Sequence, residues 1–321
     1  MITLSQIIRG CRSWLRAFFS SGFVPVPVAG WEWFIIRTGF ALLVWNEMSD
    51  FHPYAFEDQP ASIGVATMLD LRWLHHPLTM PVFQWITAAG LICYIGGWFH
   101  LAVLPVLTLL HTLLRTYENS QGSIHHSHQM ITVVLLVQTL VVWGFWFQAR
   151  RSGPLPAGAL ASWHVYYVRA GVAATYVIAA LSKLINSKGL WLWRSPYIAF
   201  DLVKAQRQKY YADLDPQYLG DTGVAEWVLA SPHLARIGFS GGFFLELFAL
   251  LAVRNRPWAF WIGLGLIAFH RGVYWLMHLR FHNNEAVLLL FFLNLPYWAW
   301  WLFQKSRGRL TPGLESAAEN S

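Results

Sequence analysis

The segment Val168–Leu184 reads VRAGVAATYVIAALSKL, and it is the best starting point for predicting the class of fold. Between Arg169 and Lys183 it contains no other charged residue, which is typical of a membrane-spanning helix. Lys183 is therefore expected near hydrocarbon, where a lysine loses hydration and its neutral amine, a base, is favoured. The position alone allows two interpretations: Lys183 is a functional base, or it extends to the lipid head groups.

The composition of the whole chain agrees with a membrane protein. Of the 321 residues, 56% are hydrophobic and 12% are charged, and that charged fraction is about half of what soluble domains carry. The 19 Trp and 22 Phe suit helices that pack together in a bilayer and end at its interfaces. We therefore predict an all-α, polytopic integral membrane protein with one helical bundle.

Hydrophobic segments recur along most of the chain and predict about eight membrane spans. They cover residues 31–48, 81–99, 101–117, 130–147, 166–184, 238–253, 258–278 and 286–303. The second and third are expected to form a hairpin that turns just after Gly96 and Gly97. The chain then divides into an amphipathic N-terminal segment (1–29), a transmembrane domain (30–304) with an insert of interfacial helices (185–237), and a tail (305–321).

The formal charge is +7, and the positions of the basic residues indicate membrane topology and not a nucleic-acid-binding surface. Basic clusters without acidic residues lie before the first span, after the fourth, between the sixth and seventh, and after the last. They are Arg9, Arg12 and Arg16; Arg150 and Arg151; Arg254 and Arg256; and Lys305, Arg307 and Arg309. The positive-inside rule then places both termini in the cytoplasm and Lys183 toward the outside. We expect a bacterial inner-membrane protein whose active site faces the periplasm.

Charged side chains within or beside the predicted spans are few. One group lies at span ends, where water is close: Glu32, Glu47 and Arg115. Another group lies deeper and consists of Arg37, Glu246, His270 and Arg271, whereas Arg169 lies near the inner end of the fifth span. Charges at membrane depth usually pair with one another or line a water-filled cavity. The deeper group is therefore expected to hold the bundle together, to line a cavity, or to do both.

Histidines precede two of the spans, both at the predicted outer face. One cluster contains His125, His126 and His128, and the other is His282-Asn283-Asn284. A histidine at such a position can donate a hydrogen bond to an oxyanion or shuttle a proton at neutral pH. The alternative is a histidine that is solvated or caps a helix.

Four short motifs are similar to those of one enzyme family. Arg169, Tyr176 with Ile178-Ala179, and Lys183-Leu184 match the first motif, and the others are His125-His126-Ser127, Phe281-His282-Asn283-Asn284 and Ile36-Arg37-Thr38-Gly39. They resemble motifs of the vitamin K-dependent gamma-glutamyl carboxylases, whose membrane core bacterial relatives share as the horizontally transferred transmembrane (HTTM) domain. The resemblance covers roughly residues 30–300.

This resemblance implies a reaction and a set of roles. In the carboxylases the matched lysine deprotonates reduced vitamin K; oxygen then adds, an epoxide and a strong base form, a glutamate γ-proton is removed, and the carbanion captures carbon dioxide. Lys183 would be the base, and His126 would act near the carbanion and carbon dioxide. The quinol oxygens would be bound by His282, Asn283, Asn284 and His125. A naphthoquinol, oxygen and carbon dioxide are thus implied, together with membrane lipids and an acceptor that is either peptide glutamate or a small molecule.

Two other classes of protein fit the sequence. His278-Leu-Arg-Phe-His282 has the HxxxH spacing of a histidine-box di-iron oxygenase, to which other histidines could add ligands. Such boxes lie on the cytoplasmic side, whereas these histidines are predicted outside, and we assign no metal ligands. A quinone-binding subunit or a small transporter would also contain intramembrane Arg and Glu, although no inverted repeat of broken helices is visible.

Overall fold

The computed structural model describes residues 24–49, 51, 67–68, 71–120, 126–153, 156, 158–218 and 222–307. All regular secondary structure in these ranges is helical, which confirms the prediction of an all-α protein. Most of the predicted N-terminal segment, most of the tail and the acidic residues Asp50, Glu57, Asp58 and Asp70 lie outside the described residues.

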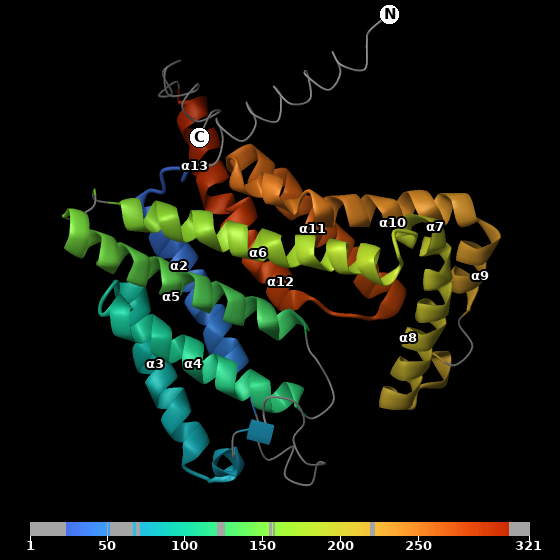
Figure 1. Ribbon diagram of the computed structural model, residues 1–321, viewed down its shortest axis with the longest axis horizontal. Helices are drawn as coiled ribbons and strands as arrows, with labels where there is room; N and C mark the ends of the chain where they lie inside the picture. Colours follow the sequence, from blue (N-terminus) through green and yellow to red (C-terminus); the bar gives the residue numbers. More distant parts are fainter. Residues whose placement is uncertain are drawn as a thin grey trace, which may run out of the picture.

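Long helices form the main bundle (Figure 1). The first half of the chain contributes α2 (Gly30–Ser49), α3 (Thr79–Gly96), α4 (His100–Asn119), α5 (His126–Ser152) and α6 (Ala159–Asn186), with a short 3-10 helix (Arg72–His75) before α3. The second half contributes α10 (Pro232–Leu247) with a 3-10 continuation (Ala249–Val253), and α11 (Arg256–Met277). The last segment is α12 (His282–Val287), a π-helix (Leu288–Leu293) and α13 (Leu295–Ser306).

Five helical segments are long and apolar enough to cross a membrane. They are Thr79–Gly96, Ser127–Ser152, Ala159–Asn186, Arg256–Met277 and His282–Ser306. Large apolar side chains such as Trp85, Trp261 and Trp275 are exposed along these segments, as expected where a helix faces lipid. These features indicate an integral membrane protein.

The predicted turn between the second and third spans is confirmed. Gly97 has φ 84° at the C-terminus of α3, a left-handed conformation that glycine adopts without a Cβ penalty. The next N–H, of Trp98, bonds to the carbonyl of Cys93 at 2.9 Å, which closes the helix end. Arg37 of α2 donates from Nη1 to the carbonyl of Tyr94 at 3.2 Å, so this arginine ties α2 to the hairpin.

The last predicted span is helical but is not one uninterrupted α-helix. Its π-helix ends at Asn294, which has φ 47° and whose N–H bonds to the carbonyl of Leu289 at 3.0 Å. The same i to i+5 pattern would pair the carbonyl of Phe291 with Pro296, which has no N–H. Arg169 replaces the missing donor, because its Nε bonds to that carbonyl at 2.6 Å. Arg169 therefore supports the broken helix.

The insert after α6 contains the expected helices. They are α7 (Trp191–Arg194), a 3-10 turn (Ser195–Tyr197), α8 (Ile198–Asp213), a second 3-10 turn (Pro216–Tyr218) and α9 (Gly223–Ala230). A small apolar core joins α8 and α9 to α10 and to the end of α11, and its buried members are Ala199, Leu202, Ala225, Val228 and Ala235. In Figure 1 these helices stand at one end of the bundle, beside the C-terminal end of α6.

Gly263 is expected to tolerate no larger residue, since α11 and the π-helix approach closely there. A Cβ at this position would lie 2.6 Å from Leu293 Cδ1 and 2.7 Å from Phe292 Cβ. Gly263→Ala should lower the free energy of unfolding by about 1–3 kcal/mol, the usual cost of overpacking. Gly144→Ala is the matched control, because nothing lies within 4 Å of its Cβ position and alanine favours the helix. Thermal unfolding in detergent would measure both, and equal midpoints would contradict this account of the contact.

Candidate functional site

Lys183 lies in the last turn of α6 and is held by an acidic partner. Its Nζ forms a hydrogen-bonded ion pair with the carboxylate of Glu246 from α10. The lysine side chain is 29% exposed and that of Glu246 is 7% exposed. Nζ also lies 5.5 Å from the ring centre of Trp191 and 5.9 Å from that of Phe269. The amine is thus fixed inside the protein and does not extend freely toward head groups.

Both members of this ion pair line a cavity of about 420 Å³, which we name the Lys183 cavity. Its size is within the range of ligand-binding pockets, about 300–1,000 Å³. Helices α5, α6, α10, α11 and α12 supply the lining: Gln129, Met130, Val133, Thr175, Tyr176, Ala179, Lys183, Glu246, Phe269, His270, Phe281 and Asn284. The cavity therefore combines aromatic and aliphatic walls with a few polar groups.

Two buried polar atoms in this lining lack a hydrogen-bond partner among the described residues. They are Nδ1 of His270 and Oδ1 of Asn284. The other ring nitrogen of His270 lies 3.4 Å from the hydroxyl of Tyr176, and the His270 ring stacks on Phe281 with ring centres 4.8 Å apart. Because buried polar atoms in proteins are nearly always hydrogen-bonded, these two atoms require a ligand or water in the cavity.

A second hollow adjoins the first on the side of the insert. It measures about 530 Å³ and is lined mainly by apolar side chains of α8, α9, α10 and α11. Lys183 and Phe269 line both hollows. Lys183 thus stands between a cavity with polar groups and a larger apolar one.

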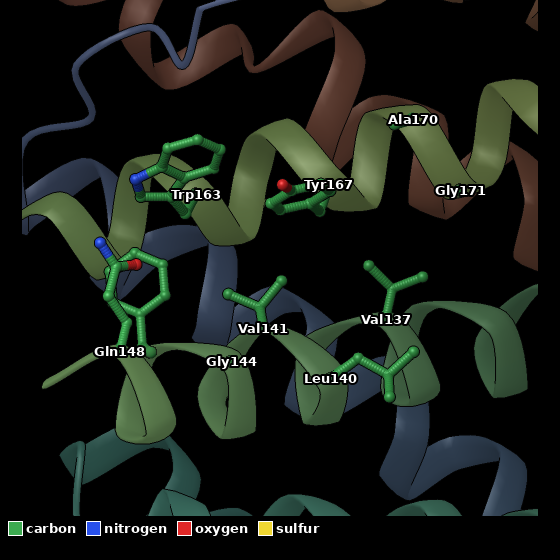
Figure 2. Close-up of a pocket in the computed structure, with 10 residues that line it drawn as sticks. Val137, Leu140, Val141, Gly144, Gln148, Trp163, Tyr167, Ala170 and Gly171 are labelled. Atoms are coloured by element: carbon green, nitrogen blue, oxygen red, sulfur yellow. The ribbon is translucent and has the colours of Figure 1, made fainter. Parts of the chain in front are cut away.

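A third hollow lies in the groove between α5 and α6 and is shown in Figure 2. Figure 2 shows Val137 and Val141 of α5 pointing toward the helix that carries Trp163 and Tyr167. Its volume is about 480 Å³. The lining is mainly apolar, with polar groups only from Gln148, Tyr167 and the indole N–H of Trp163, and it includes none of the predicted site residues. We therefore do not assign the functional site to this groove.

The motif that begins at Phe281 is divided between two environments. Phe281 and Asn284 line the Lys183 cavity. His282 instead has Nε2 3.6 Å from Oε1 of Glu47, and its side chain is 57% exposed. Asn283 is fully buried, and its side chain interacts with the carboxylate of Glu47. Of the predicted quinol-binding residues, the structure places Asn284 beside Lys183 and places His282 and Asn283 outside the cavity lining.

Two histidines before the fourth predicted span, His126 and His128, lie at the same end of the bundle as His282. His125 is outside the described residues, and His126 is the first residue of α5. The ring of His128 is hydrogen-bonded to Glu47, and its centre is 6.3 Å from that of His282.

Arg271 pairs with an acidic residue of another helix and does not line the Lys183 cavity. Its side chain is 61% exposed, and Nη2 pairs with Oε2 of Glu285 at 2.5 Å. Successive residues of an α-helix point about 100° apart, so α11 directs His270 into the cavity and Arg271 away from it. Among the other residues predicted within the spans, Glu246 and His270 line the Lys183 cavity, whereas Arg37 and Arg169 bind backbone carbonyls.

The three charges expected near water at span ends are buried. Glu32, Glu47 and Arg115 have exposed fractions of 1%, 3% and 6%. Nη2 of Arg115 contacts Oε2 of Glu47 at 2.8 Å, and Glu32 binds Arg256 at the other end of α2. Burial is tolerated because each charge has a partner from another helix.

The histidine-box spacing does not produce a cluster of ligands in the part of the chain that the structure describes. No group of three or more His, Cys, Asp or Glu side chains in that part is arranged to hold a metal ion. His278 packs edge-on against Tyr218 at 5.3 Å, whereas His282 faces Glu47. The two histidines of the HxxxH pair thus have different surroundings.

Fold and site together define a polytopic helical membrane protein with a lysine–glutamate pair in the wall of an internal cavity. Comparison of the chain with known protein families, with curated proteins and with solved structures finds no match. The resemblance to the carboxylases stays a prediction based on the four motifs.

Proposed function

We propose that this protein is a membrane enzyme that uses a reduced quinone of the vitamin K type and oxygen, with Lys183 as the base. The observation that carries the proposal is the Lys183–Glu246 pair in the wall of a cavity that also contains partnerless buried polar atoms. A residue of this kind, desolvated and close to a charged partner in a cavity, is a typical candidate for catalysis.

The residues present fit such a quinol. Phe269 and Phe281 offer ring faces that suit a flat bicyclic aromatic. His270 Nδ1 or Asn284 Oδ1 can accept a hydrogen bond from the quinol hydroxyl that does not give its proton to Lys183. The adjoining apolar hollow gives room for a hydrophobic substituent on the ring. When bound, the quinol would react with oxygen, and that reaction would generate a strong base.

The Lys183–Glu246 pair can exchange a proton with a bound hydroxyl. The proposed step starts from the form of the pair in which the shared proton is on the carboxyl group of Glu246 and the amine of Lys183 can act as a base. Nζ of Lys183 then accepts a phenolic proton, and the resulting ammonium stabilises the oxyanion beside it. Glu246 fixes the amine in position throughout.

Carboxylation of a glutamate-like acceptor is the proposed outcome, by resemblance to the carboxylases. His126 would act at the acceptor, because it begins α5 at the end of the bundle where His128 and His282 also lie. The apolar and aromatic part of the cavity wall supports this chemistry, since a strong base must be kept from water.

The proposed topology has eight spans and both termini in the cytoplasm. Helices α2, α4 and α10 with its 3-10 continuation would join the five apolar segments to make this count. The Lys183 cavity would then open toward the periplasmic face of a bacterial inner membrane. The insert helices α7 to α9 would lie against the outer leaflet, where exposed Trp193, Phe200 and Tyr211 suit the lipid interface.

Incubation of the purified protein with a reduced naphthoquinone and oxygen tests this function. Chromatography would follow oxidised quinone and epoxide, and labelled bicarbonate would report carboxylation of a glutamate-containing peptide. Quinol consumption above that of protein-free detergent is expected. If quinol were consumed no faster than in protein-free detergent, the proposal would be wrong. If quinol were oxidised but no label were incorporated, the quinol chemistry would stand, and glutamate would not be the acceptor.

Asn284→Leu is expected to weaken naphthoquinone binding about 5- to 10-fold. This variant keeps the side-chain size but removes the acceptor Oδ1, and one hydrogen bond contributes about 1 kcal/mol. Binding would be measured by quenching of tryptophan fluorescence. Asn186→Leu, at an exposed position at the end of α6, is the control and should bind like the unchanged protein. Equal affinities of the two variants would show that Asn284 does not contact the quinone.

A further inference from the structure

Polar side chains form a row along α4, on the side of the bundle away from Lys183. The row consists of His100, Thr108, His111, Arg115 and Glu118. Their separations of eight, three, four and three residues place them on one face of the helix. From the first to the fourth the helix rises about 22 Å, most of the roughly 30 Å of a bilayer's hydrocarbon core. A polar row of this length inside an apolar bundle calls for an explanation.

One end of the row is a charged cluster. The carboxylate of Glu47 accepts a hydrogen bond from Arg115 at 2.8 Å and is hydrogen-bonded to the ring of His128. Arg115 also donates to Glu118 at 2.6 Å. His282, which is 57% exposed, lies 3.6 Å from Glu47 and connects the cluster to the surface of the protein. This end therefore contains groups that can take up and release protons.

The middle of the row is a pair of side-chain contacts between α4 and α5. His111 Nδ1 lies 2.8 Å from the hydroxyl of Thr132, and the hydroxyls of Thr108 and Thr139 are 2.9 Å apart. His111 is fully buried, and its Nε2 has no partner among the described residues. The middle thus consists of uncharged groups, each of which can donate and accept a hydrogen bond.

The other end of the row lies at the α3–α4 turn. Gln138, next to Thr139, accepts a hydrogen bond from the hydroxyl of Tyr94 at 2.7 Å. The carbonyl of Tyr94 is 3.4 Å from Nε2 of His100, which begins α4 and is only partly buried. Separate polar contacts are thus spaced at intervals between the Glu47 cluster and a histidine at the opposite end of α4.

Helix packing alone does not account for this row. If its members only joined helices, their polar atoms would satisfy one another. Instead, two buried atoms along the row have no partner among the described residues: Nε2 of His111 and Nε2 of Gln138. Buried atoms of this kind normally bind internal water, so water molecules are expected between the side chains.

We propose that this row, together with internal water, is a proton path across the membrane. Histidines, hydroxyls and water can each accept one proton and give up another, and such chains conduct protons in membrane proteins. A proton that enters at the Glu47–His128 end is balanced by one released at His100, with no net change in any residue between them. The middle holds no charged side chain, so a metal cation or an anion passing there would meet no opposite charge. The path does not depend on the chemistry proposed for Lys183.

Proton flux into liposomes tests the path. The full-length protein would be reconstituted in vesicles that contain a pH-sensitive dye, and a potassium gradient with valinomycin would set the driving potential. Vesicles with the unchanged protein are expected to acidify faster than protein-free vesicles. His111→Leu and Thr132→Val should each lower the protein-dependent flux at least 10-fold. Thr112→Val is the matched control, because that exposed hydroxyl only bonds to its own helix at the carbonyl of Thr108.

The outcomes separate a proton path from a structural role. Thr132→Val is nearly isosteric and keeps the fold, so it carries the test if His111→Leu fails to elute as a folded species in gel filtration. Tyr94→Phe removes a second hydroxyl in the same way. Flux in the unchanged protein equal to that of protein-free vesicles would overturn the proposal. So would flux in both hydroxyl variants equal to that of Thr112→Val.

Discussion

Lys183→Ala is expected to lower the oxidation of a reduced naphthoquinone by this protein about 100-fold or more, since general base catalysis contributes about 10²–10⁴ to a rate. The lysine is positioned for this role by its ion pair with Glu246 in the cavity wall. Lys183→Arg should be equally impaired, because a guanidinium keeps the charge but does not give up its proton in proteins. Initial rates of quinol consumption under oxygen would measure both variants.

Two further variants make the comparison specific. Glu246→Gln retains the size of the side chain but removes the carboxylate that holds the amine of Lys183. It should lower kcat about 10-fold and change KM less, because binding of the quinol ring does not depend on this carboxylate. Lys204→Ala, at an exposed position on α8, should leave the rate within about twofold. If Lys183→Arg were as active as the unchanged protein, Lys183 would supply charge and not a base. If Lys183→Ala were also active, the proposed reaction would not use this residue.

Much of the fold could be predicted because membrane helices are defined by long apolar segments. The hairpin turn at Gly97 is visible in the sequence, and the structure has it. The break in the last span was missed, although Pro296 inside an apolar segment is a signal for it. Arg169 supports this break by binding the carbonyl of Phe291. The contact could not be predicted, because the two residues are 122 positions apart in the sequence.

The candidate site was predictable as a set of residues but not as an arrangement. Lys183 and Glu246 were both selected as charges in apolar segments, yet they are 63 residues apart and nothing in the sequence pairs them. The sequence indicates Tyr176 only as one position of a motif and predicts no role for it. In the structure its hydroxyl lies beside His270 in the cavity. His270 points inward and Arg271 points outward because of the way α11 is rotated about its axis in the bundle. The periodicity of the hydrophobic residues does not predict that rotation.

Glu32→Ala is expected to be among the most destabilising single substitutions in this bundle. Glu32 is 1% exposed, and its two carboxylate oxygens accept hydrogen bonds from Arg256 at 2.6 Å and 3.0 Å. Asn294, at the break in the last span, also donates to it. Removing one partner of a buried ion pair leaves the other charge without compensation, which costs about 3–5 kcal/mol. Reversible unfolding in mixed detergent micelles would measure the loss.

The origin of that loss can be resolved with a second substitution at the same pair. Glu32→Leu combined with Arg256→Met replaces both charges by apolar groups of similar size and should cost less than Glu32→Ala alone, since no charge is left buried. Arg150→Ala is the control: its guanidinium packs 3.9 Å from the ring centre of Trp146 at an exposed position, where little stability is expected from it. If Glu32→Ala cost no more than Arg150→Ala, the ion pair would not hold α2 to α11. The loss in free energy of unfolding of the double variant could instead equal the sum of the losses of its two single substitutions. The stabilisation would then come from the separate contacts of each residue and not from the pairing of charges. One such contact is the Arg256 guanidinium, 3.6 Å from the ring centre of Tyr297.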